Sequence, residues 1–210
     1  IAWIGHPARM DEPLEKIVAG SWDLKAAVED QKKAAEAQAN AQKYQEKLAD
    51  ATKTEDPDKV LAAIDEIVKE APGMAANLDG LKFGALLRKG DDDKVVELGR
   101  TLLDGEVGKN ADALNSIAWS IVDPDAKHKP SVKLLAFALE VAERADELTK
   151  GKNPYVADTL AKAYFDSGKH AKALEVQKRA LENATGTDLE DDDGMKERLE
   201  QYEKAVKDGN

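Results

Sequence analysis

The sequence predicts an all-α protein built from helical hairpins. Alanine, leucine, glutamate and lysine dominate its 210 residues, and these are strong helix formers and weak strand formers. Only 5% of the residues are aromatic, and apolar residues recur three or four positions apart through long stretches. With 42% hydrophobic and 35% charged residues, the composition is that of an ordinary chain with a packed core.

The first twenty residues are expected to form one strand and one short helix. Residues 1–4 are of the strand-favouring type, and a Gly-His-Pro turn follows them. An acidic start with Pro13 then leads into an apolar helix that ends at Gly20. Because a lone strand leaves its backbone hydrogen-bonding groups unpaired, residues 1–6 are predicted to be frayed or paired with another copy of the chain.

A long helix and a second, shorter helix are predicted over residues 21–72. No glycine or proline occurs between Trp22 and Lys53, where small and apolar residues recur three, four or seven positions apart. At about 1.5 Å per residue, this helix would be about 45 Å long. The second helix follows Pro57 and is predicted to stop at an Ala-Pro-Gly sequence, so that the two helices form a hairpin.

Residues 73–210 contain an internal repeat of helical pairs. Each of three copies has a small residue in a first helix, a residue in a second helix 12 positions later, and another 7 positions beyond that. In the middle copy the first distance is 20, because the turn is eight residues longer. A small residue at a helix crossing lets the two backbones approach closely. The positions are Gly84, Val96 and Leu103 in the first copy, Ala118, Ala138 and Ala145 in the second, and Ala161, Ala173 and Ala180 in the third.

These spacings, together with the segment Leu-Ala-Lys-Ala-Tyr-Phe at residues 160–165, resemble tetratricopeptide repeats. The resemblance covers about residues 75–184, and its first copy is degenerate. It implies hairpins stacked into a short right-handed solenoid. A further amphipathic helix, with apolar residues from Met195 to Val206 and a charged outer face, is expected to close the stack as a cap.

Residues 1–20 resemble the last strand and helix of a thioredoxin-like, or redoxin, domain. Combined with a long alanine-rich helix and tetratricopeptide-like repeats, they are similar to the C-terminal part of a bacterial thiol-disulfide protein. The resemblance implies that a redox-active Cys-x-x-Cys precedes residue 1 and that the parent protein is extracytoplasmic. No catalytic residue can be assigned here, because the chain has no cysteine.

No catalytic, cofactor-binding or metal site is predicted. The net charge of −11 opposes contact with nucleic acid, and no apolar run is long enough for membrane insertion. The three histidines lie far apart, and neither a nucleophile elbow nor a nucleotide-binding loop is present. Acidic residues 191–200 fall near the spacing of a calcium loop, but Leu189 occupies the first ligand position.

The resemblance to tetratricopeptide repeats implies a concave groove lined by the first helix of each hairpin, which in this family commonly receives a protein or peptide segment. Three of the residues expected there could hold a carboxylate, namely Arg88, Asn115 and Lys162, and two aromatic residues could supply apolar contact. An alternative is that Trp119 packs between hairpins. The expected groove residues are Leu81, Arg88, Asn115, Trp119, Asp158, Lys162 and Phe165.

The function favoured by these observations is a non-enzymatic scaffold that binds a protein or peptide segment or associates with itself. In one alternative, the parent is a redoxin-type thiol-disulfide oxidoreductase whose substrates this region positions. In another, the chain is an independent adaptor unconnected with redox chemistry. A Cys-x-x-Cys about a hundred residues before residue 1 is required if the redoxin resemblance holds.

Overall fold

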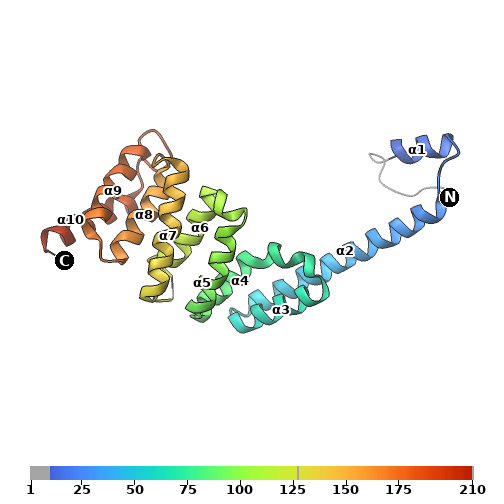
Figure 1. The fold of residues 1–210 in the computed structure, drawn as a ribbon, viewed down its shortest axis with the longest axis horizontal. Helices are drawn as coiled ribbons and strands as arrows, with labels where there is room; N and C mark the ends of the chain where they lie inside the picture. Colours follow the sequence, from blue (N-terminus) through green and yellow to red (C-terminus); the bar gives the residue numbers. More distant parts are fainter. Residues whose placement is uncertain (1–9, 127, 210) are drawn as a thin grey trace. The chain divides into compact units, whose positions relative to one another are not determined.

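The computed structural model describes residues 10–126 and 128–209, and the predicted strand at residues 1–4 lies outside these ranges. Within them the fold is all-α, as predicted, and contains no strand. Figure 1 shows the order of the elements. The helices are α1 Asp11–Val18, α2 Leu24–Lys53, α3 Pro57–Glu70, α4 Ala75–Lys89, α5 Asp92–Asp104, α6 Ala111–Val122, α7 Val132–Thr149, α8 Pro154–Asp166, α9 His170–Ala184 and α10 Asp193–Lys207, with short 3-10 helices at Pro72–Met74 and Val107–Lys109.

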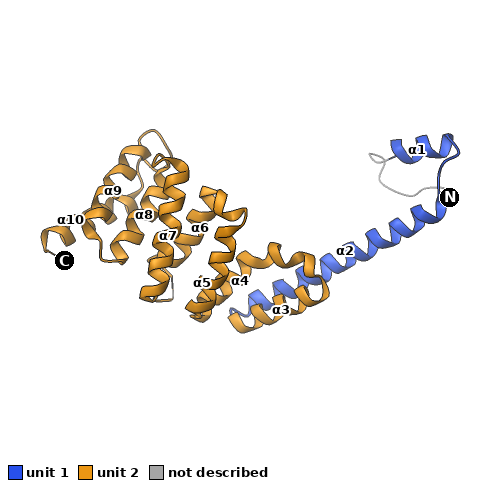
Figure 2. Ribbon diagram, in the orientation of Figure 1, with its two compact units in different colours: residues 1–55 blue, residues 56–210 orange. Residues whose placement is uncertain are grey.

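The chain divides into two units, an N-terminal unit of residues 1–55 and a C-terminal unit of residues 56–210 (Figure 2). The N-terminal unit holds α1 and α2, which confirms the short helix before Gly20 and the long helix after it. The carboxylate of Asp23 begins α2 by accepting hydrogen bonds from two backbone N–H groups. Along the 30 residues of α2, Tyr44 is the only buried side chain.

The C-terminal unit contains the pairs of helices that the repeat predicts. Helix α4 packs on α5, α6 on α7, and α8 on α9, and each pair corresponds to one copy of the repeat. Further contacts join α5 to α7, α7 to α8 and α6 to α8, and α10 packs mainly on α9. Besides the contacts within each pair, α5 with α7, α6 with α8 and α7 with α8 therefore join one pair to the next (Figure 1).

Two of the pairs turn through a glycine in the left-handed conformation. Gly90 and Gly168 have φ of 76° and 73°, a region that side chains with a Cβ rarely adopt. After α4, the N–H of Asp91 donates to the carbonyl of Leu86 at 3.1 Å. After α8, the N–H of Lys169 makes the equivalent bond to Tyr164 at 2.9 Å. Both turns thus end the first helix with the same Schellman-type pattern.

The repeat positions lie in the core with one exception. In the second and third copies all six alanines are fully buried, at 0% exposure, and in the first copy Val96 and Leu103 are buried. Gly84 differs, because it is only half-buried and a Cβ built on it would meet nothing within 4 Å. The prediction that Gly84 permits a close helix crossing is therefore wrong.

The close approach lies instead at Gly99, in the middle of α5. A Cβ at this position would collide with the ring of Phe137 on α7. Phe137 is itself 2% exposed, so its ring has no room to move aside. The glycine therefore lets the large aromatic ring of α7 fill the space against α5.

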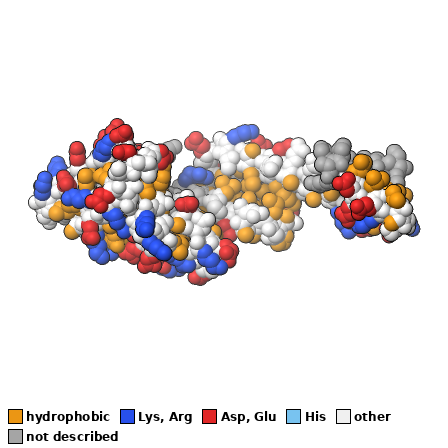
Figure 3. All heavy atoms as spheres, turned by 90° about the horizontal axis from the view of Figure 1, so that it is seen from above, with side chains coloured by type: hydrophobic (Ala, Val, Ile, Leu, Met, Phe, Trp, Pro, Cys, Tyr) orange, Lys and Arg blue, Asp and Glu red, His pale blue; other side chains and the backbone are white. Residues whose placement is uncertain are grey.

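Helix α10 forms at the predicted place and buries Met195 and Tyr202. Val206, predicted on the same face, is 38% exposed. On the face of the molecule that Figure 3 shows, acidic and basic side chains are mixed. In the described ranges, no helix is both long enough and apolar enough to cross a membrane.

Candidate functional site

The candidate site is an open pocket of about 240 Å³ between α6, α8 and α10. It gathers side chains that are far apart in the sequence, because α8 packs on α6 and on α10. Three of the residues predicted for the groove, Asn115, Trp119 and Asp158, are among those that line it. The full lining is Asn115, Trp119, Tyr155, Asp158, Thr159, Leu189, Asp192, Met195 and Arg198.

One wall of the pocket is a nearly buried ion pair. Arg198 donates from Nε to Oδ1 of Asp158 at 3.0 Å and from Nη2 to Oδ2 at 2.7 Å. The two side chains are 17% and 10% exposed. Gln177 of α9, which is fully buried, donates to the same Oδ1 at 2.8 Å and to the backbone carbonyl of Met195 at 3.2 Å. Asp158 thereby ties α8 to both α9 and α10.

Trp119 both packs against the main hydrophobic core and lines the pocket, the two roles that the sequence leaves open for it. The guanidinium of Arg198 lies 5.6 Å from the centre of its ring, within the range of a cation–π contact. The ion pair and the indole ring therefore hold each other in place.

Asn115 presents an unsatisfied acceptor. Its Oδ1 atom is buried and has no hydrogen-bond donor among the described residues. A buried carbonyl oxygen without a donor costs about 1–3 kcal/mol. Because this oxygen exposes almost no surface, a ligand N–H or O–H would offset the cost once the Asn115 amide turns toward the pocket.

Tyr155 forms an exposed edge of the pocket. Its hydroxyl donates to Oδ2 of Asp188 at 2.5 Å, and the side chain remains 45% exposed. This hydrogen bond to a carboxylate raises the pKa of the Tyr155 hydroxyl, and burial raises it further. The tyrosine lies in the first turn of α8, where Asn153 caps the helix and Pro154 occupies the first helical position.

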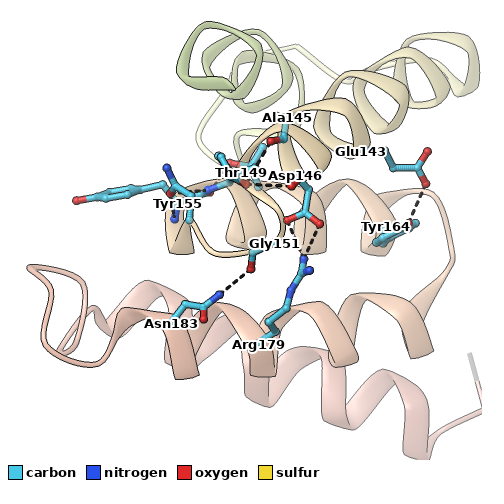
Figure 4. Close-up of polar contacts among 12 residues, drawn as sticks. Glu143, Ala145, Asp146, Thr149, Gly151, Tyr155, Tyr164, Arg179 and Asn183 are labelled. Atoms are coloured by element: carbon cyan, nitrogen blue, oxygen red, sulfur yellow. Dashed lines mark hydrogen bonds and ion pairs between the residues drawn. The ribbon is translucent and has the colours of Figure 1, made fainter. Parts of the chain in front are cut away.

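Polar contacts also join α7, α8 and α9 to one another (Figure 4). Arg179 of α9 donates to both carboxylate oxygens of Asp146 of α7, at 2.8 and 2.9 Å. Tyr164 of α8 donates to Glu143 of α7 at 2.8 Å. Burial and this hydrogen bond raise the pKa of Tyr164 to about 12. In Figure 4, the side chain of Tyr155 projects away from these contacts.

Neither a family model nor a curated protein matches the chain. The chemistry of the pocket is therefore the basis for any functional conclusion. In the part of the chain that the structure describes, no group of three or more histidine or acidic side chains could hold a metal ion.

The other predicted groove residues lie elsewhere. Leu81 is half-buried and Arg88 is exposed on α4, and neither lines the pocket. Lys162 is predicted to hold a ligand carboxylate, but its ammonium already donates to both oxygens of Asp166 at 2.6 and 2.5 Å. Phe165 stacks on Tyr202 of α10, with ring centres 4.4 Å apart, and so packs between helices.

Six lining residues are absent from the predicted set: Tyr155, Thr159, Leu189, Asp192, Met195 and Arg198. The sequence carries one usable signal for them. Asp158 is a single carboxylate among the small and apolar residues 156–161, a segment that the structure buries, and a buried carboxylate requires a cationic partner. That partner, Arg198, lies 40 residues away on the helix expected to be charged only on its outer face.

Proposed function

We propose that the C-terminal unit is a non-catalytic binding module that accepts a segment of another protein in the pocket between α6, α8 and α10. The observation that carries this proposal is the composition of the pocket. An aromatic ring, a phenol and the side chains of Leu189 and Met195 line the same pocket as Asn115, whose buried amide oxygen is unsatisfied. Aromatic residues beside a few directed polar groups are typical of recognition sites.

The size and charges of the pocket favour a side chain of a partner as the occupant. Its volume of about 240 Å³ is below the range of about 300–1,000 Å³ that is usual for small-molecule sites. Its cationic group is engaged in a structural contact, because Arg198 binds Asp158, whereas Asp192 uses one of its two oxygens to cap α10. A second copy of this chain is a disfavoured occupant, since each copy carries a net charge of −11.

A displayed library of random peptides, selected on the full chain, tests the proposal. Enriched peptides are expected to bind at least about ten-fold more weakly to Tyr155→Ala, because tyrosine is enriched among the interface residues whose truncation costs about 2 kcal/mol or more. Val132→Ala is the matched control, since Val132 is 86% exposed and does not line the pocket. Circular dichroism melting would verify that both variants are folded.

Two results would contradict the proposal. One is a selection that enriches no peptide on the folded chain. The other is a set of enriched peptides whose affinity is the same for Tyr155→Ala, Val132→Ala and the unmodified protein. In the second case the peptides bind another surface.

A further inference from the structure

We infer that the partner segment carries a lysine or arginine and that the pocket holds its cationic group. This inference rests on the proposed function and specifies the chemistry of its ligand. It differs from the sequence-based expectation, in which cationic groove residues hold a carboxylate of the partner.

The charge balance of the pocket is the first argument. Asp158 and Asp192 line it, whereas Arg198 is the only cationic side chain among the described residues that do so. Because Arg198 and Asp158 neutralise each other through two hydrogen bonds, the charge of Asp192 remains. Asp188 adds another carboxylate beside the pocket, where Tyr155 holds it.

The segment that leads into α10 strengthens this negative potential. Five of the six residues 188–193 are acidic. One of them, Asp191, forms an ion pair with Lys196 at 3.5 Å. Two of the five, Asp188 and Asp192, lie at the pocket, where carboxylates attract a cation before contact is made. The potential at the pocket thus opposes an acidic ligand.

The donor and acceptor inventory is the second argument. The unsatisfied Oδ1 of Asn115 is an acceptor, so the ligand atom that reaches it must be a donor. Asp192 uses Oδ1 to accept from the N–H of Met195 at 2.7 Å, which leaves its other oxygen for a second donor. An ammonium has three N–H donors and a guanidinium five, and neither has an acceptor.

The apolar lining is the third argument. Lysine and arginine have long methylene stems that commonly lie along apolar surfaces while the charged head reaches polar groups. The side chains of Leu189, Met195 and Trp119 provide such a surface within the pocket. The same site thus offers contacts to both parts of a basic side chain.

A carboxylate ligand finds few donors in the pocket. Arg198 already directs one N–H of Nε and one of Nη2 at Asp158, and this carboxylate neutralises the charge that would attract an anion to the remaining N–H groups. Lys162 is bound by Asp166 and does not line the pocket. An anion would also meet the charge of Asp192 at close range, which is unfavourable at low local dielectric.

The experiment uses the enriched peptides of the display selection in three synthetic forms. In these forms the lysines and arginines are kept, replaced by glutamine, or replaced by glutamate. Fluorescence anisotropy with the full chain is expected to show about ten-fold weaker binding for the glutamine form and weaker binding still for the glutamate form. Affinity of the basic form is expected to fall as salt is added.

A pair of variants localises the charge. Asp192→Asn keeps the helix cap but removes the carboxylate that lines the pocket, because asparagine caps helices as well as aspartate does. It is expected to weaken the basic form about ten-fold. The matched control is Asp191→Asn, which removes the same charge from a side chain that is 100% exposed and outside the pocket. Its expected effect is below about two-fold.

The outcomes distinguish this inference from the proposed function. Enriched peptides without basic residues, or glutamate forms that bind as well as basic forms, overturn the inference and leave the binding module in place. Equal effects of Asp192→Asn and Asp191→Asn also overturn it, because the attraction would then come from the general field of the chain. A selection that enriches no peptide overturns the proposed function itself.

Discussion

Helices α2 and α8 form by different means. Helix α2 has 30 residues and buries one side chain, Tyr44. Helix α8 has 13 residues and buries eight. Both begin with a side-chain cap, from Asp23 and Asn153, so the ends of the helices do not explain the difference. Helix α2 depends on local interactions, whereas α8 depends on tertiary packing.

The local interactions of α2 are visible along its surface. Alanine, which has the highest helix propensity, occurs throughout the helix. Lys33 pairs with Glu29 at 3.2 Å and Gln42 donates to Glu46 at 3.0 Å, both across one helical turn. Each such pair stabilises a helix by about 0.2–0.5 kcal/mol. The stability of helix α2 therefore comes from many small contributions, none of which is dominant.

The same substitution in the two helices tests this comparison most strongly. Leu160→Ala in α8 removes a side chain that is 3% exposed, and it is expected to lower the free energy of unfolding by about 3–5 kcal/mol. Leu24→Ala in α2 truncates a side chain that is 49% exposed, with an expected change below about 0.5 kcal/mol. Urea denaturation measures both, and equal values would remove the distinction between the helices.

The ion pair at the pocket gives the second-largest expected effect. Asp158→Ala leaves the guanidinium of Arg198 nearly buried without its carboxylate, and we expect a loss of about 2–3 kcal/mol. The double variant Asp158→Leu with Arg198→Met replaces both charges by apolar groups and is expected to recover most of this loss. A double variant less stable than Asp158→Ala would show that α8 needs the ion pair itself. Thermal and urea unfolding of the three proteins provide the comparison.

The helices of both units are predictable from sequence for local reasons. Periodic apolar residues, capping residues and breaks at glycine or proline define α2, α3 and α10 within a few residues. The 12 and 7 spacing predicts which alanines are buried, because the same helix crossing recurs in the second and third copies. The classification of these pairs as tetratricopeptide repeats stays a prediction.

Contacts between distant segments account for what the sequence analysis missed. Gly84 and Gly99 are both helical glycines, and only the structure reveals that Gly99 faces Phe137 while Gly84 faces open space. The guanidinium of Arg198 meets Asp158 across 40 positions, so helical periodicity within α10 contains no information about it. Four of the nine lining residues, in α10 or just before it, therefore depend on how α10 packs, which local patterns do not determine.

The resemblance of residues 1–20 to a redoxin ending stays a prediction. Helix α1 forms as expected, and its side chains Leu14 and Val18 are 48% and 80% exposed. In the redoxin ending that residues 1–20 resemble, the last helix packs on the sheet, and there these two side chains would be buried. Sequencing the encoded region before residue 1 would test the resemblance, because a Cys-x-x-Cys is required there.

Tyr164 of α8 gives the comparison between α2 and α8 a pH dependence. The pKa of Tyr164 is about 12 in the folded protein, above the ordinary value of 10.0, because burial and the Glu143 carboxylate disfavour its ionised form. Its contribution to the free energy of unfolding is therefore fully present below pH 10 and is lost as the pH rises toward 12. Urea unfolding at several pH values should show a shallower decline above pH 10 for Tyr164→Phe. Identical slopes for the variant and the unmodified protein would contradict this.

The smallest expected effect concerns the cap of α2. Asp23 Oδ1 accepts hydrogen bonds from the N–H groups of Lys25 and Ala26, at 2.9 and 3.0 Å. Asp23→Ala removes both bonds and is expected to destabilise the start of α2 by about 1 kcal/mol. Because α2 has little buried surface to compensate for the lost cap, amide hydrogen exchange in its first turns should accelerate in Asp23→Ala. Asp23→Asn retains a capping oxygen and should change the exchange rates little. The amides of α8 should exchange at unchanged rates in both variants. If Asp23→Ala left exchange in the first turns of α2 unaltered, interactions other than its cap and its local pairs would hold that helix.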